Sequence, residues 1–269
     1  DVSEKILCDI MKKHQGYYLD KIGERKARKG KKVTWTDSDN NKHDLDFVIE
    51  RNGTEENVGT PIAFIESAWR RYTKHSRNKS QEIEGALLHL GKTYQNLHPF
   101  LGAILAGEFT PGAITQLESH KFNVLYLPYS SIIKAFKIVG IDIAFTESTS
   151  ELVFKKKLEK FSKLSKSQLS KISTELLKIE RSEIKKFQNA IEKSLIRKII
   201  EIRILPLHGL GKTIDSLKNA FKFINEYDEK KSITNFERYE IKITYNNRDV
   251  IHAEFGSKKD IVEFLTQLK

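Results

Sequence analysis

The chain has 269 residues, of which 39% are hydrophobic and 31% charged, so it is long enough to bury a sizeable core in one large or two modest domains. No apolar run approaches the length that crosses a membrane, and residues 1–10 lack a signal-peptide pattern. The net charge of +11 favours nucleic acid or an anionic surface as the partner.

The first predicted element is a helix at residues 3–14, where apolar side chains recur on one face and Gly16 follows as the expected end. This helix contains Cys8, the only cysteine of the chain. A single cysteine excludes a disulfide framework within the chain and a cysteine-based zinc site, and we expect a reducing, cytoplasmic setting.

A basic segment follows at residues 21–32, with seven lysines and arginines against one acid. A solvated loop would explain such a run. Contacts to backbone phosphates would explain it too, since they require only charge and reach. We favour phosphate contacts and assign them to Arg25, Lys26, Arg28 and Lys29.

Three short segments rich in β-branched and aromatic residues come next, and we expect them to form neighbouring strands at 33–37, 43–50 and 62–69. Alternation in the second strand places Asp44 and Asp46 on one face, and Leu45, Phe47 and Ile49 on the other. Asp44 lies beside a turn, where solvation explains it. Asp46 lies further in, where an acid needs a metal or a cation as partner.

The third strand carries Glu66, and a basic run follows it directly. Carboxylates near strand ends, next to a basic run, suit a metal-dependent enzyme that acts on a polyanion. Carboxylate oxygens hold Mg²⁺, and Lys and Arg contact phosphates. We therefore assign DNA contacts to Arg70, Arg71, Lys74 and Arg77.

The pattern after this run alternates between helices and strands. Residues 78–95 predict an amphipathic helix, in which Gln81 and Glu84 are three apart and share a face. Buried strands are expected at 100–108 and 122–128 in the same sheet as the earlier ones, each followed by a helix. Short joints of this kind predict a mixed or parallel central sheet flanked by helices on both faces, which is an α/β fold.

The composition changes near residue 147, and we expect a core domain at 1–147 and a C-terminal domain at 148–269. Residues 151–200 contain neither Gly nor Pro and predict helices. The remainder predicts a small α/β layer with a strand at 199–207, a helix at 213–228, a hairpin around Asn246 and Asn247 and a last helix. The sequence LHGLGKT (207–213) lacks the first glycine of a phosphate loop, because Pro206 takes that position.

The order of these motifs resembles the PD-(D/E)XK nuclease superfamily, most of all its restriction-endonuclease branch, over about residues 1–145. That family has an Asp on one strand, Glu-x-Lys on the next, and often a Gln or Glu on the following helix. Here Asp46, Glu66 and either Gln81 or Glu84 take these places. The resemblance implies a restriction-endonuclease-like core, with Mg²⁺ held by Asp46, Glu66 and the backbone carbonyl of Ser67.

The sequence departs from the family at Ala68, where a lysine usually stands near the attacking water. A methyl group cannot act as a cation, so another residue must supply the charge. Lys79 is the first candidate because it begins the helix expected to pack beside the Glu66 strand, and Lys74 and Arg70 follow. Arginine serves less well in proton transfer, since it stays protonated.

We therefore expect a Mg²⁺-dependent endonuclease that hydrolyses phosphodiester bonds of double-stranded DNA, as a type II restriction enzyme does, with Asp46, Glu66, Lys79 and Gln81 as its catalytic residues. The resemblance adds a homodimer, since symmetric cutting uses symmetric pairs. The C-terminal domain would then recognise DNA or mediate dimerisation. Ala68 supports an alternative, a catalytically degenerate DNA-binding protein on the same scaffold. In a third reading the chain is an RNA-binding or scaffold protein whose acids are only structural.

Overall fold

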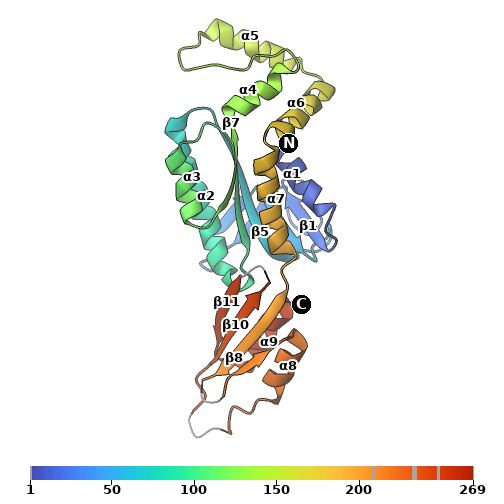
Figure 1. The fold of residues 1–269 in the computed structure, drawn as a ribbon, viewed down its shortest axis with the longest axis vertical. Helices are drawn as coiled ribbons and strands as arrows, with labels where there is room; N and C mark the ends of the chain where they lie inside the picture. Colours follow the sequence, from blue (N-terminus) through green and yellow to red (C-terminus); the bar gives the residue numbers. More distant parts are fainter. Residues whose placement is uncertain (1, 208–209, 232–234, 247–248, 269) are drawn as a thin grey trace.

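The computed structural model describes residues 2–207, 210–231, 235–246 and 249–268. A larger part built around one sheet stands above a smaller part built around another, and the two meet end to end (Figure 1). No helix among the described residues is both long and apolar enough to span a bilayer.

The central sheet of the larger part is mixed, and among the described residues it has five strands in the order β1-β4-β5-β6-β7. The strands β1, β4 and β5 pair antiparallel, whereas β5, β6 and β7 pair parallel. Their bounds are Tyr17–Lys21, Phe47–Arg51, Thr60–Arg70, Phe100–Gly107 and Asn123–Pro128. The expected α/β class with a mixed central sheet is confirmed.

Helices cover both faces of this sheet (Figure 1). One face packs on α1 (Val2–Met11), α4 (Tyr129–Lys137), α6 (Lys166–Ile179) and α7 (Arg181–Leu195). The other packs on α2 (Ser76–Thr93), α3 (Pro111–Ser119) and the hairpin of β2 (Val33–Thr36) and β3 (Lys42–Leu45). Burial on both faces explains the nearly continuous apolar runs of the central strands, where each fully buried Ile or Phe contributes about 1.5–3 kcal/mol.

The expectation that residues 33–37 join the central sheet is wrong. Strand β2 pairs with β3 in a separate two-stranded sheet within the described chain, and its place is taken by β1. Strand β1 is only half apolar, since Tyr17, Tyr18 and Leu19 are followed by Asp20 and Lys21. Because the polar end of β1 continues into the basic segment, the sequence shows no strand pattern there.

The expected strand at 43–50 is broken at Asp46. Strand β3 ends at Leu45, the chain bends, and β4 begins at Phe47. The bend resets the alternation, so Leu45 packs with Val48 on the α2 side while Phe47 and Ile49 pack on the α7 side. The expected shared face of Leu45, Phe47 and Ile49 is therefore wrong.

The core of the larger part draws on residues from both sides of position 147. Helices α6 and α7 contribute Ile172, Ile184, Phe187 and Ile191 to the cluster that contains Ile65 of the central sheet. The structure thus joins these helices to the N-terminal part. Between α4 and α6, helix α5 (Glu151–Ser162) extends from the body and, within the described chain, buries none of its own residues (Figure 1).

The smaller part is an antiparallel sheet with two helices, as the pattern predicts. Its elements are β8 (Ile199–Pro206), β9 (Lys212–Ile214), α8 (Leu217–Glu226), β10 (Tyr239–Tyr245), β11 (Val250–Phe255) and α9 (Lys258–Gln267). Helix α8 begins four residues later than expected, because 212–214 forms a strand and the Ser216 hydroxyl accepts the N–H of Asn219 as the helix cap. Residues 208–209 of LHGLGKT and 247–248 of the hairpin lie outside the described residues.

Candidate active site

Asp46 lies where the ladder between β4 and β5 ends. The last pair of this ladder joins Phe47 to Ile65, and no described β4 residue pairs with β5 beyond it. The Asp46 carboxylate takes over as acceptor: its Oδ2 receives the backbone N–H of Ser67 at 2.8 Å and the Ser67 hydroxyl at 3.1 Å. The bend at Asp46 and this contact together direct the carboxylate at the part of β5 that β4 does not pair with.

Glu66 lies next to this contact and is 9% exposed. It shares the α2-facing side of β5 with Phe64 and Ala68. Its Oε1 accepts the backbone N–H of Asp46 at 3.3 Å, so each acid contacts the segment that carries the other. The two acids expected from the sequence are therefore brought together by the fold.

Glu66 is a buried carboxyl group next to a second acid. Burial, followed by the charge of Asp46, raises the pKa of Glu66 to about 7. The positive charge of Lys79 and the N–H of Asp46 oppose this rise without cancelling it. A carboxyl group with a raised pKa beside a second acid is a typical feature of a functional site, and a bound cation would lower that pKa.

Of the three cation candidates, Lys79 is the one whose charge acts on Glu66. Its side chain is 22% exposed and lies 3.1 Å from the carboxylate of Glu82 on the same helix. Lys74 is instead 65% exposed and pairs with Glu147 at 3.8 Å. The structure thus brings Lys79 towards the carboxylate pair and directs Lys74 away from it.

The three arginines of the basic run that starts at the end of β5 differ in their surroundings. Arg70 donates from Nη1 to its neighbour's backbone carbonyl at 2.9 Å. The guanidinium of Arg71 lies over the rings of Tyr129 and Phe145, 4.0 and 4.5 Å from their centroids, which holds it in place by cation–π attraction. Arg77 is exposed in the first turns of α2.

The two acid or amide candidates on α2 do not join the pair. Gln81 is exposed, one position away from the buried face that contains Ser80 and Ile83. Glu84 accepts a hydrogen bond from Gln116 at 2.6 Å and pairs with His120, so it connects α2 to α3.

The assignment of Arg25 to DNA phosphates is wrong, because its guanidinium is buried. Arg25 is 4% exposed and donates to both oxygens of Glu50, at 2.7 and 2.9 Å, while its Nη1 lies 2.9 Å from Asp20. It also donates to the backbone carbonyls of Thr54 and Asn57. These contacts tie the basic segment to β1, β4 and the turn after β4.

Arg28 has a similar structural role. Its Nε lies 3.1 Å from Asp20, and it donates to the backbone carbonyls of Gly30 and Lys21. Lys26 and Lys29 remain exposed, Lys26 at 3.5 Å from an acid and Lys29 without an ion pair to any described residue. The two arginines of the basic segment therefore form internal contacts that hold it against β1 and β4. Its exposed lysines remain candidate phosphate contacts.

A second group of possible metal ligands was not expected from the sequence. Donor atoms of Asp37, Asp39 and His89 lie within 4.8 Å of one another. The Asp37 carboxylate, however, already accepts hydrogen bonds from the backbone of Asp39 and Asn41 and from the His43 ring, so it closes the β2–β3 turn. The signal in the sequence was the turn itself, which explains these acids without a metal.

Searches of protein-family models, of curated proteins and of solved structures found no match to this chain.

Proposed function

We propose that the protein is a Mg²⁺-dependent endonuclease whose catalytic centre is the Asp46–Glu66 pair. The observation that carries this proposal is the convergence of two acids, one at the bend before β4 and one on β5, beside the charge of Lys79; the acid on β5 has a pKa raised to about 7. The pKa of Glu66 is raised first by burial and then by the charge of Asp46, and a bound cation would oppose both effects.

The oxygen atoms available at the pair fit a hard divalent ion. Asp46 Oδ1 and Glu66 Oε2 accept no hydrogen bond within the described part of the chain, and Ser67 adds a backbone carbonyl at the same point of β5. Carboxylate and carbonyl oxygens are the ligands that Mg²⁺ takes in proteins. When bound, such an ion neutralises phosphate charge and acidifies a water molecule.

Lys79 is proposed to supply the cation that Ala68 cannot. Ala68 is 7% exposed and packs in the cluster under α2, where a lysine side chain would have to be buried. Lys79 reaches the same side of β5 from the first turns of α2. Its ammonium group has three N–H donors and no acceptor, so it can donate to a phosphate oxygen or to the attacking water.

The order of elements supports a restriction-endonuclease-like core as part of the proposal. Helix α1 is followed by the antiparallel strands β1, β4 and β5, then by α2 and the parallel strands β6 and β7 with α3 between them. Double-stranded DNA as substrate and a homodimer as the cutting unit belong to the same proposal, since a symmetric cut in both strands requires a symmetric pair of active sites. Sedimentation at working concentration tests the dimer.

The decisive experiment is a plasmid digest in Mg²⁺ and in EDTA with three proteins. The wild type is expected to give discrete fragments in Mg²⁺ alone, and Asp46→Asn is expected to give none. The matched control is Asp44→Asn, which removes an exposed acid two residues away that pairs with Lys32 and should cut as the wild type does. Cleavage by Asp46→Asn at the wild-type rate would refute the proposed site.

The burial of Ala68 also favours a second candidate function, a DNA-binding protein that does not cut. The same digest, run beside a DNA-binding assay, separates the two. Binding without cleavage in Mg²⁺ supports the non-catalytic protein. The absence of DNA affinity supports the third reading, in which these acids are structural.

A further inference from the structure

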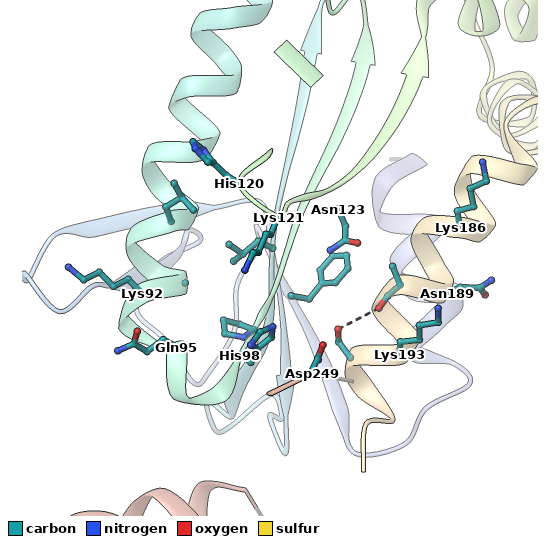
Figure 2. A pocket seen from close by; sticks show the side chains of 17 residues that line it. Lys92, Gln95, His98, His120, Lys121, Asn123, Lys186, Asn189, Lys193 and Asp249 are labelled. Atoms are coloured by element: carbon teal, nitrogen blue, oxygen red, sulfur yellow. Dashed lines mark hydrogen bonds between the residues drawn. The ribbon is translucent and has the colours of Figure 1, made fainter. Parts of the chain in front are cut away.

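A cavity of about 860 Å³ lies where the larger and smaller parts meet (Figure 2). Its lining comes from the end of α2, the turn after η2 (Gln95–Leu97), the first residues of β6 and β7, and α7. Asp249, just before β11, lies at its lower edge. Lys92 in this lining lies about 20 Å along α2 from Lys79, at about 1.5 Å per residue, so the cavity is separate from the carboxylate pair.

The walls of this cavity are strongly cationic. Lys186 and Lys193 project from α7 on one side, Lys92 from α2 on the other, and Lys121 between them (Figure 2). Asp249 is the one acid among the described lining residues. Lys92 and Lys121 are both exposed and pair with no described acid. Lys186 already pairs with an acid of α7 at 2.7 Å. An anion in the cavity would neutralise the charges of Lys92 and Lys121.

Two residues in the left-handed backbone region line the same cavity. In the described chain the non-glycine residues with positive φ are Asn40, Asn52, His98 and Lys121. Asparagine tolerates this left-handed region, but His98 at φ 49° and Lys121 at φ 64° each cost about 1–2 kcal/mol relative to glycine. Both of these side chains line the cavity. Both residues also lie at helix ends, since His98 closes η2 and Lys121 follows the last turn of α3, where left-handed residues are common.

The remaining lining combines apolar side chains with neutral polar ones. Gln95, Asn123 and Asn189 offer side-chain amides, which donate to phosphate oxygens as readily as lysines do. Partial burial lowers the pKa of His98, and the charges of Arg197 and Lys121 act in the same direction against that of Asp249. The positive charge of the cavity therefore comes from its lysines.

We propose that this cavity binds backbone phosphates of the nucleic acid on which the Asp46–Glu66 pair acts. The lysines come from three separate elements and stand on different sides of the cavity, which suits a run of phosphates rather than a single ion. This inference rests on the proposed function, and it adds a second contact region at the junction of the two parts. That junction is a packed one, since Leu97 of η2 belongs to the core of the smaller part.

The test uses a change that removes a cation and relieves strain at once. Lys121→Gly, combined with Lys92→Ala, should weaken binding of a fluorescein-labelled DNA duplex by about 10-fold and reduce the slope of log K against log salt by about 2. Because glycine accepts positive φ, the thermal midpoint of Lys121→Gly should equal or exceed that of the wild type. Weaker binding with equal or greater stability distinguishes a ligand contact from a structural one.

Two control variants accompany it. Asn52→Gly makes the same backbone change outside the cavity, and Lys171→Ala removes an exposed lysine of α6 that does not line it. Both should bind the duplex with wild-type affinity. Binding is measured in EDTA, so cleavage does not interfere, and inorganic triphosphate is added as a competitor.

The outcomes separate this inference from the proposed function. If the double variant binds duplex as the wild type does while the wild type binds and cuts DNA, the cavity proposal fails and the endonuclease proposal stands. If the wild type binds no DNA but binds triphosphate through Lys121, the cavity is a phosphate site of another kind and the nucleic-acid assignment fails. If the wild type neither binds nor cuts DNA, both proposals fail together.

Discussion

The carboxylate Oδ2 of Asp46 lies 2.8 Å from the backbone nitrogen of Ser67, at the point where a continuing strand β4 would have placed a carbonyl oxygen. This one contact ends the β4–β5 ladder and brings Asp46 beside Glu66. The same side chain is thus both a strand cap and a proposed metal ligand, and the two roles respond differently to substitution.

Asp46→Asn and Asp46→Ala should separate these roles. Asparagine keeps an oxygen that accepts the Ser67 N–H, so its free energy of unfolding should stay close to that of the wild type. Alanine leaves the N–H without its partner and should lower the free energy of unfolding by about 1–3 kcal/mol. Both variants should lose Mg²⁺-dependent cleavage, because both lose the charge. Urea unfolding measures the first effect, and a stable, cleaving Asp46→Ala protein would contradict both.

The raised pKa of Glu66 predicts how stability depends on pH in the metal-free protein. The folded state holds this proton up to about pH 7, whereas the unfolded chain releases it near 4.5. Between these values the folded state binds more protons, so its stability should fall as the pH rises, by about 3 kcal/mol in all. Urea titrations in EDTA from pH 4 to pH 8 measure this fall.

Glu66→Gln is the matched control for that titration, because it is neutral throughout. It should equal the wild type near pH 4 and exceed it at pH 8, where the wild type must bury a charge. Added Mg²⁺ should restore the wild type at pH 8 and leave Glu66→Gln unchanged. If the stability of the wild type changes between pH 5 and pH 7 in the same way as that of Glu66→Gln, then Glu66 is already ionised in that range and the prediction is wrong.

Lys79→Ala should slow cleavage by about 10²-fold to 10⁴-fold if Lys79 takes part in proton transfer or charge stabilisation at the phosphate. Since the charge of Lys79 lowers the pKa of Glu66, its removal should also move the pH–stability fall to higher pH. Lys74→Ala and Arg70→Ala should leave the pH profile unmoved and should cut at the wild-type rate once DNA is saturating. Normal cleavage and an unmoved pH profile in Lys79→Ala would assign the cation role elsewhere.

Arg25→Ala should lower the free energy of unfolding by about 3–5 kcal/mol, because it leaves Glu50 buried without a cation and Asp20 with Arg28 alone. Arg25→Lys should rescue little, since one ammonium cannot match the two-oxygen contact with Glu50. Lys29→Ala, an exposed neighbour, should leave stability unchanged. Urea unfolding of the three variants checks this, and a stable Arg25→Ala protein would refute the structural role of Arg25.

Local pattern was enough to predict much of this molecule. The apolar runs of β5, β6 and β7 and the stripe of Ile83, Leu87 and Leu90 on α2 follow from side-chain periodicity. The choice of Asp46 and Glu66 follows from the cost of burying charge. Each of these features depends on residues close together in the chain, where the spacing of 2 or 3.6 residues per repeat is a direct consequence of backbone geometry.

Only the tertiary structure decided the features that depend on distant partners. Asp46 bends the chain because Ser67 receives its carboxylate, and Arg25 is internal because Glu50 and Asp20 surround it. The same holds for the cationic cavity, since its lysines come from helices and turns that meet only once both parts have packed. Such contacts depend on the free energy of the whole packed chain. A buried charge requires a partner, and a backbone N–H that loses its sheet hydrogen bond requires another acceptor. No local pattern carries that information.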